Sequence, residues 1–167
     1  MSATQPILES IHDRLEAQLP SFTVELFPDN VDDYFLKDEL GAVLVQYAGS
    51  KFETVGSSDI IQQRRVVAVA LTILARSQHD DSGALAMLDQ VRLAVVGFRP
   101  TNCEAISLLS EEFAGEASGI WQYQLLLRTE TWQVENRICE DKPGLIHVHA
   151  RRPHDPLNPD LKAKHNP

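Results

Sequence analysis

Residues 62–76, QQRRVVAVALTILAR, form a long apolar segment with arginines at both ends. In an extended chain, alternate side chains point to opposite faces. One face of this stretch then carries Val67, Val69, Leu71 and Ile73, and the other carries Val66, Ala68, Ala70 and Thr72. Because both faces are apolar, the pattern predicts a strand that is buried on both sides.

A buried helix is the alternative, because the periodicity of a continuous apolar run fits either element. Five β-branched residues between Val66 and Ile73 favour the strand. Strands of globular proteins are usually shorter than this one. We therefore expect one end to project beyond the domain's own sheet and to pack against something else, which favours a role in assembly.

One helix and two strands are predicted before this segment. The helix has apolar residues at helical spacing: Ile7, Leu8, Ile11, Leu15 and Leu19. The first strand has alternating apolar residues: Phe22, Val24 and Leu26. The second strand covers residues 41–47, and Gly49 and Ser50 are predicted to close it.

One helix and two strands are predicted after it. Ser82 is expected to cap the second helix, and Gly97 is expected at its C′ position. The predicted core face of this helix is Leu85, Leu88, Val91 and Val95. A weaker strand follows over residues 105–113, and a long last strand runs from Trp121 to about Val134. We expect Trp121 to be buried against Val91 and Val95.

The predicted order is therefore α-β-β-β-α-β-β. Helices that are separate from mostly antiparallel strands give an α+β two-layer sandwich. The chain has 167 residues, of which 43% are hydrophobic, and this is enough to form one domain with a buried core. We predict that this domain covers residues 1–139. No apolar run reaches the ~20 residues of a membrane helix, and the first residues lack a secretory signal pattern. We expect no membrane partner.

Residues 140–167 differ from the rest, because they hold five of the nine prolines and four of the six histidines. Such a composition buries little apolar surface. We predict a C-terminal extension without a fold of its own, which lies along an adjacent subunit or a neighbouring protein.

Charge is unevenly distributed along the chain. Residues 1–60 hold 3 basic and 11 acidic residues, within a total net charge of −9. This balance argues against a nucleic-acid binder. The acidic third could instead meet the arginines of another copy, although solvated acidity that maintains solubility is an equally good explanation for any single residue. The candidate interface residues are Asp29, Asp32, Asp33, Asp38, Glu39, Arg64, Arg65 and Arg76.

The sequence contains few candidates for metal-binding or catalytic residues. His147 and His149 share one side of an extended segment, and His154 follows, so a divalent metal is conceivable there. These histidines lie in a proline-rich stretch without a preorganised scaffold, and a tail that contacts solvent or a partner is the favoured interpretation. The chain has no nucleophile elbow, phosphate loop or dinucleotide fingerprint. We predict no catalytic residue, no cofactor and no metal.

Several short motifs together resemble a known family. They are the opening helix over residues 7–19, GAVLVQYAGS at 41–50, QQR at 62–64, GFRP at 97–100 and GIWQY at 119–123. Their order and spacing resemble the Mu-like phage and prophage tail-terminator family, which is similar in fold to the lambda tail terminator. The resemblance covers residues 7–134.

The resemblance implies a structural protein that forms a hexameric ring. Such a ring caps the tail tube, stops its polymerisation and presents a surface to a head-completion or connector protein. It implies a place in the virion, at the head-proximal end of the tail, after assembly in the host cytoplasm. DNA would pass through the lumen without specific binding. The alternatives are another ring protein of the phage neck or tail tube, and a small metal-dependent enzyme.

Overall fold

The computed structural model describes residues 4–28, 40–56 and 60–137. The chain divides into two compact units, residues 1–135 and 136–167, and the architecture below is that of the first. The elements are α1 (Thr4–Gln18), β1 (Thr23–Leu26), β2 (Gly41–Phe52), β3 (Gln62–Ala75), α2 (Ala84–Val95), β4 (Ser107–Ala117) and β5 (Ile120–Val134). This confirms the predicted order of elements. The predicted extension, residues 140–167, lies outside the described residues.

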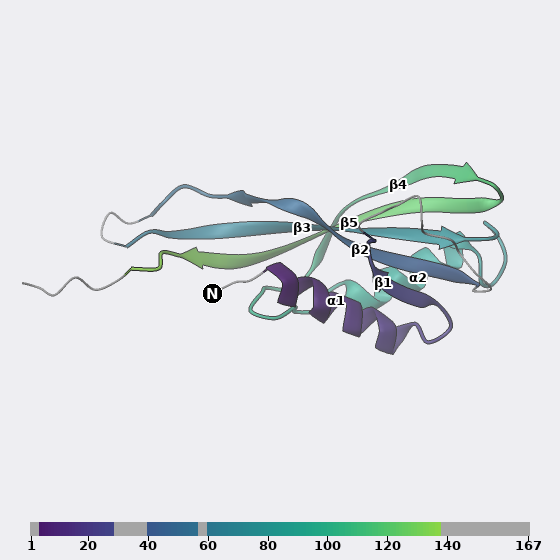
Figure 1. Cartoon of the computed structure of the whole chain (residues 1–167), viewed down its shortest axis with the longest axis horizontal. Helices are drawn as coiled ribbons and strands as arrows, with labels where there is room; N and C mark the ends of the chain where they lie inside the picture. The colour runs from purple at the N-terminus through teal and green to yellow at the C-terminus, as the bar shows by residue number, and fades with distance from the viewer. Residues whose placement is uncertain (1–3, 29–39, 57–59, 138–167) are drawn as a thin grey trace, which may run out of the picture. The chain divides into compact units, whose positions relative to one another are not determined.

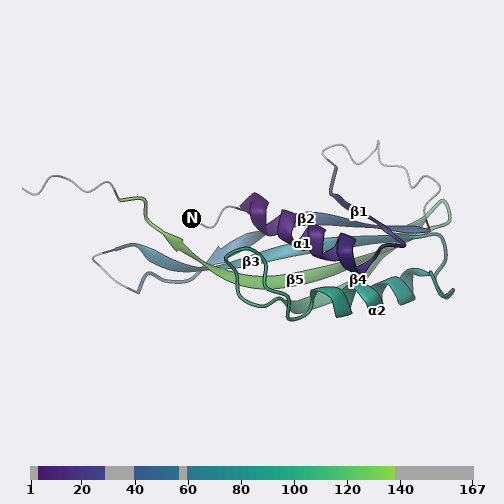
Figure 2. The same ribbon diagram turned by 90° about the horizontal axis from the view of Figure 1, so that it is seen from below.

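The five strands of this unit form one sheet in the order β1-β2-β3-β5-β4. β1 pairs with β2 in parallel, and every other neighbouring pair is antiparallel. Both helices lie on the same face of the sheet (Figures 1 and 2). The predicted α+β class, a two-layer sandwich with a mostly antiparallel sheet, is therefore confirmed.

The central strand β3 supplies the floor of the core. Its predicted aliphatic row is fully buried beneath the helices: Val67, Val69, Leu71 and Ile73. Ile11 and Leu15 of α1 and Leu88 of α2 join the same cluster. Burial of each such side chain contributes about 1.5–3 kcal/mol relative to leaving it in water.

The other face of β3 differs from the prediction. Val66, Ala68 and Thr72 are only half-buried there, whereas Ala70 is buried. The predicted burial on both sides is wrong for these three residues, because both described helices lie on one face. A row of small and β-branched residues suits a half-covered face as well as a buried one.

β2 continues past its predicted end. Gly49 and Ser50 do not close the strand, because the pairing with β3 shifts between Tyr47 and Gly49 and then continues to Phe52. Gly49 has φ +125°, a conformation that side-chain-bearing residues rarely adopt. The glycine therefore marks a β-bulge inside a longer strand, and not a turn.

α2 begins one residue later than predicted. Gly83, not Ser82, occupies the N-cap position, and it makes no side-chain cap. The helix then buries Ala84, Met87, Leu88, Val91, Ala94 and Val95. Leu85 is exposed, so its predicted core position is wrong, because it lies about 100° around the helix from Ala84. Gly97 has φ +78°, as predicted for the C′ position.

Trp121 is partly buried and packs against the core cluster that includes Val91 and Val95, in line with its predicted position against α2. It lies close to the turn that joins β5 to the edge strand β4, where its ring centroid is 5.8 Å from that of Phe113. An edge strand offers fewer neighbours than a central one, which leaves the indole partly in solvent.

The sheet and α2 approach each other closely at Gly41. A Cβ atom at Gly41 would lie 2.4 Å from Sδ of Met87 and 2.8 Å from the carbonyl oxygen of Leu74. We predict that Gly41→Ala lowers the free energy of unfolding by about 2 kcal/mol, in line with typical overpacking costs. Urea unfolding measures this. Gly56→Ala is the control, because a Cβ there meets nothing within 4 Å. Equal stability of the two variants would contradict the packing at Gly41.

Candidate functional site, a three-stranded arm

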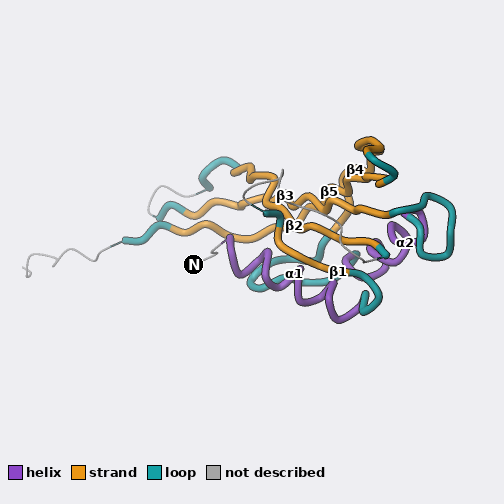
Figure 3. The backbone as a smooth tube through the Cα atoms, turned by 45° about the vertical axis from the view of Figure 1, so that its right-hand side comes forward, coloured by secondary structure: helices purple, strands orange, loops and turns teal. Residues whose placement is uncertain are grey.

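Three strands of the sheet continue beyond the helices, and we call this part the arm (Figures 1 and 3). It consists of residues 49–52 of β2, 62–68 of β3 and 128–134 of β5, and its base, at Arg65 and Val67, is still buried against the start of α1. The strands pair without interruption to its end, where the Glu135 amide donates to the Ile61 carbonyl at 2.8 Å. The projecting end predicted for the long strand is thus present, with β2 and β5 alongside it.

The bulge at Gly49 organises the base of the arm. Tyr47 lies opposite Val69 and Ser50 lies opposite Val67, so both side chains point to the helix side of the sheet. In a regular strand, residues three apart point to opposite faces. The extra residue of the bulge therefore places two hydroxyl groups on the face that carries Arg65.

Arg65 uses these hydroxyl groups to join three elements. Its side chain is buried, with 6% of the residue exposed. Nε donates to Ser50 Oγ at 2.9 Å, and Nη2 donates to Thr4 Oγ1 at 2.7 Å and to Tyr47 OH at 3.4 Å. Hydrogen bonds of a charged donor contribute roughly 1.5–3 kcal/mol each. Arg65 therefore holds the start of α1 and the bulge of β2 against β3.

The phenol of Tyr47 responds to this environment. Its hydrogen bond with Ser50, and then the adjacent Arg65 guanidinium, lower the pKa of Tyr47 below its usual value, against an opposing effect of burial. The Arg65 guanidinium also lies 5.9 Å from the centroid of the Tyr47 ring. The contacts of Tyr47 with Ser50 and Arg65 therefore help to hold the base of the arm to the part of the sheet that the helices cover.

The far part of the arm exposes large apolar side chains. About half of the Trp132 surface, 54%, is accessible. The other exposed apolar residues of the arm and its connecting loop are Phe52, Val55, Ile60, Ile61 and Val134. We call these six residues the apolar end of the arm. Trp132 and Val134 point to the helix-free face, whereas Phe52, opposite Arg65, points to the helix side. Exposed apolar residues of this kind mark protein interaction sites, and tryptophan is enriched among the residues that dominate binding energy.

The arginines predicted as interface residues have different environments. Arg64 points to the helix-free face and forms an ion pair with Glu130 of β5. Arg65 is buried inside the subunit, and Arg76 is exposed just after β3, at the end away from the arm. The structure therefore does not bring the three arginines together. The predicted acidic partners Asp29, Asp32, Asp33, Asp38 and Glu39 lie outside the described residues, and their pairing stays a prediction.

Sequence reasoning missed Arg128, Glu130 and Trp132 as candidate interface residues. All three lie on the helix-free face, where Arg64 is directly opposite Trp132 and Ala68 is opposite Arg128. The strand pattern placed them on alternate positions of β5, but only the pairing register of β3 with β5 puts them beside Arg64.

Two other features of the described residues are candidates for chemistry: the cluster of His12, Asp13 and Glu16, and the Cys103 thiol. His12, Asp13 and Glu16 are close enough to hold an ion, but both carboxylates are exposed and Nε2 of His12 lies 3.1 Å from the Val24 carbonyl oxygen. Burial raises the pKa of the Cys103 thiol, which disfavours the nucleophilic thiolate. His147, His149 and His154 lie outside the described residues. Neither described helix is long and apolar enough to cross a membrane.

Comparison with known proteins supplies a family and a fold. The profile of the Gp37 protein family matches residues 11–151, so the chain belongs to this family. No curated protein matches the chain. A chain from the virion of a native gene transfer agent (GTA) particle has a similar structure, with a TM-score of 0.53 and 11% sequence identity. The similarity covers 79% of this chain and 98% of that chain, and at this identity it shows a shared fold.

Replacing Arg65 and Arg64 in turn tests whether Arg65 holds the base of the arm to α1. We predict that Arg65→Gln lowers the free energy of unfolding by about 2–3 kcal/mol, because the charged donors to three hydroxyl groups are lost. Arg64→Gln is the matched control and should change it by less than about 1 kcal/mol, as for an exposed ion pair. Urea unfolding of the dilute protein gives both values. A larger effect at Arg64 than at Arg65 would refute the anchoring role.

Proposed function

We propose that this member of the Gp37 protein family is a structural protein of a phage-like particle, and specifically its tail terminator. Three findings support the proposal. The fold matches nearly all of a chain from a virion particle, the sequence motifs resemble those of tail terminators, and the arm carries an exposed apolar end. We also propose that it acts as a structural component and not as an enzyme.

The observation that carries the proposal is the apolar end of the arm. A projecting sheet with exposed tryptophan, phenylalanine and aliphatic residues promotes aggregation of a free monomer. The same surface becomes stabilising when a second copy covers it. The arm is therefore best explained as one half of a contact between copies.

The geometry of one arm per copy favours a ring. When the arm binds a different surface on the next copy, the contact is heterologous, and it closes into a ring if the rotation between copies divides a full turn. We propose six copies, as the resemblance implies. The ring would sit at the head-proximal end of the tail, on the tail tube protein and beneath a head-completion or connector protein.

The charge of the chain suits a channel that DNA crosses without binding. Tight binding of DNA requires arginine and lysine contacts to many phosphates. With a net charge of −9, the protein as a whole repels the phosphate backbone. An acidic lumen would let DNA slide through the ring. Such a protein would be assembled in the host cytoplasm and found in the virion.

Sedimentation velocity of the purified protein tests the ring. We predict a species with six times the subunit mass. Trp132→Glu should weaken assembly by roughly 30-fold or more in dissociation constant, because it removes a central apolar contact and adds a charge.

Trp132→Phe is the control, because it keeps an apolar ring and should retain most of the assembly. A protein that remains monomeric at high concentration would overturn the ring. Equal assembly of both variants would show that the apolar end of the arm is not the contact. Adding the ring to growing tail tubes separates a terminator, which stops their growth, from another ring protein of the neck or tube, which does not.

A further inference from the structure

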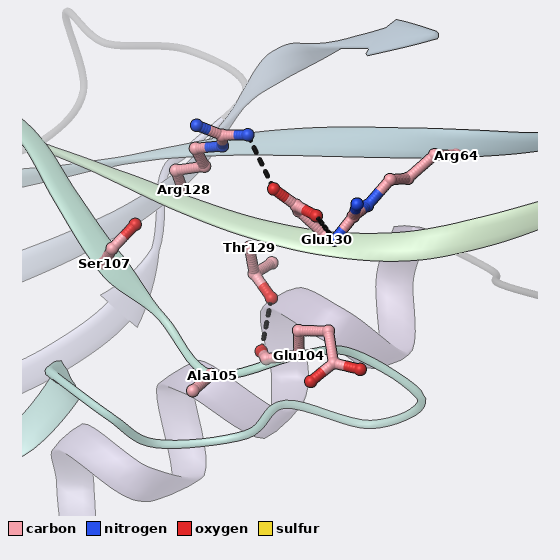
Figure 4. Close-up of a pocket in the computed structure, with 7 residues that line it drawn as sticks. All are labelled: Arg64, Glu104, Ala105, Ser107, Arg128, Thr129 and Glu130. Carbon is pink, nitrogen blue, oxygen red and sulfur yellow. Dashed lines mark hydrogen bonds and ion pairs between the residues drawn. The ribbon is translucent and has the colours of Figure 1, made fainter. Parts of the chain in front are cut away.

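A hollow of about 370 Å³ lies at the base of the arm, against the outer edge of β5. Residues 102–104 close this edge. The Glu104 amide donates to the Glu130 carbonyl at 2.8 Å, and the Thr129 hydroxyl donates to the Glu104 carbonyl at 2.6 Å. Figure 4 shows Arg64 and Arg128 on either side of the Glu130 carboxylate in this hollow. One backbone hydrogen bond and one hydroxyl hydrogen bond therefore hold residue 104 against β5, and Arg64, Arg128 and Glu130 come from two neighbouring strands.

The charged groups that line the hollow are two arginines and two glutamates, and one of the glutamates is paired with an arginine outside the hollow. Arg128 Nη2 donates to Glu130 Oε1 at 2.6 Å, and Arg64 pairs with the second oxygen of the same carboxylate. Two guanidinium groups thus share one carboxylate. The carboxylate of Glu104 also borders the hollow, but it pairs with Arg99 at 3.1 Å. When Arg99, which lies outside the lining, is counted with its partner Glu104, three arginines and two glutamates leave one excess positive charge in this network.

The two arginines keep donors available for a ligand. A guanidinium has five N–H donors, and one ion pair uses only one or two of them. The side chains of Arg64 and Arg128 are 45% and 40% exposed, whereas Glu130 beneath them is 18% exposed. Arg128 Nε is buried and has no hydrogen-bond partner among the described residues, so it is not one of the donors that a ligand can reach from solvent. The hydroxyl of Ser107, which also lines the hollow, can add a further donor.

We propose that Arg64 and Arg128 bind a carboxylate from residues 25–39 of a second copy of this chain. This inference rests on the proposed assembly into a ring. Residues 25–39 contain six acidic residues and one lysine, the strongest local concentration of negative charge in the sequence. The planar guanidinium fork matches a carboxylate in geometry, and one excess positive charge matches a single carboxylate in magnitude.

A phosphate group fits the same hollow less well. A phosphate can carry two negative charges, and Glu104 and Glu130 in the lining would repel the second. The net charge of −9 also opposes the approach of a nucleic acid. The carboxylate of a neighbouring copy is therefore the preferred ligand.

The position of the hollow links it to the apolar end of the arm. Arg64 is the direct cross-strand partner of Trp132, and both side chains point to the helix-free face. One neighbouring copy can therefore cover the indole and place a carboxylate between the arginines. In such an arrangement, the apolar contact supplies most of the affinity, and the charged contact fixes the relative position of the copies.

Binding of a synthetic peptide with the sequence of residues 25–39 tests the site without requiring a ring. Fluorescence anisotropy of the labelled peptide would be measured against protein dilute enough to sediment as a monomer. We expect Arg128→Gln to weaken binding roughly tenfold or more. Arg128→Lys, which keeps the charge and loses the fork, should weaken it by a smaller factor.

Lys51→Gln is the matched control, because it removes one positive charge from the same face of the arm outside the hollow. It should weaken binding by a clearly smaller factor than Arg128→Gln, because Lys51 is exposed and does not line the hollow. An equal loss in Lys51→Gln and Arg128→Gln would overturn the proposal, since general attraction would then explain the binding. Displacement of the peptide by inorganic phosphate at matched ionic strength would also overturn it, in favour of a phosphate site.

The two proposals fail in different ways. Peptide binding that depends on Arg128, in a protein that never forms a ring, would retain the carboxylate site and remove the proposed assembly. A ring whose dissociation constant is unchanged by Arg128→Gln, together with absent peptide binding, would retain the assembly and remove the carboxylate site.

Discussion

The antiparallel register of β3 with β5 is the constraint on which the rest of the structure depends. Fourteen consecutive residue pairs, from Gln62 opposite Val134 to Ala75 opposite Trp121, fix the two strands along their whole length. At one end, this register aligns the aliphatic rows that the helices cover. At the other end, the same pairing continues after the helices stop, so the arm extends the sheet that carries the core. A slip by one residue would move the aliphatic row to the other face and would separate Arg64 from Glu130.

The bulge at Gly49 and the buried side chain of Arg65 couple the arm to the body. Without the extra residue, Ser50 would point away from the guanidinium, and the start of α1 would lose part of its link to the sheet. A preorganised arm loses little conformational entropy when a second copy binds, which favours assembly. The half-exposed indole of Trp132 and the charged hollow then occur on one rigid face. Stability of the subunit and its proposed assembly therefore depend on the same strands.

Much of the fold follows from the periodicity of the sequence, and most of the candidate site does not. Helical spacing from Ile7 to Leu19 and alternation in β3 and β5 identified the elements, because these patterns are local. Gly49 and Ser50 were predicted as a strand end, since the same residues suit a turn and a bulge. Arg64 and Arg65 were grouped as interface residues, although strand alternation already places adjacent side chains on opposite faces. The residues of β5 that lie beside Arg64 can be identified only from the pairing register of β3 with β5, and no local sequence pattern specifies that register.

Electron cryo-microscopy of the assembled protein tests the central claim, that the arm joins one copy to the next. We predict a closed ring of six copies in which the apolar end of each arm is covered by its neighbour and Arg128 faces an acidic side chain of that neighbour. A ring in which Trp132 and the other apolar residues of the arm remain in solvent, with copies joined elsewhere, would contradict it.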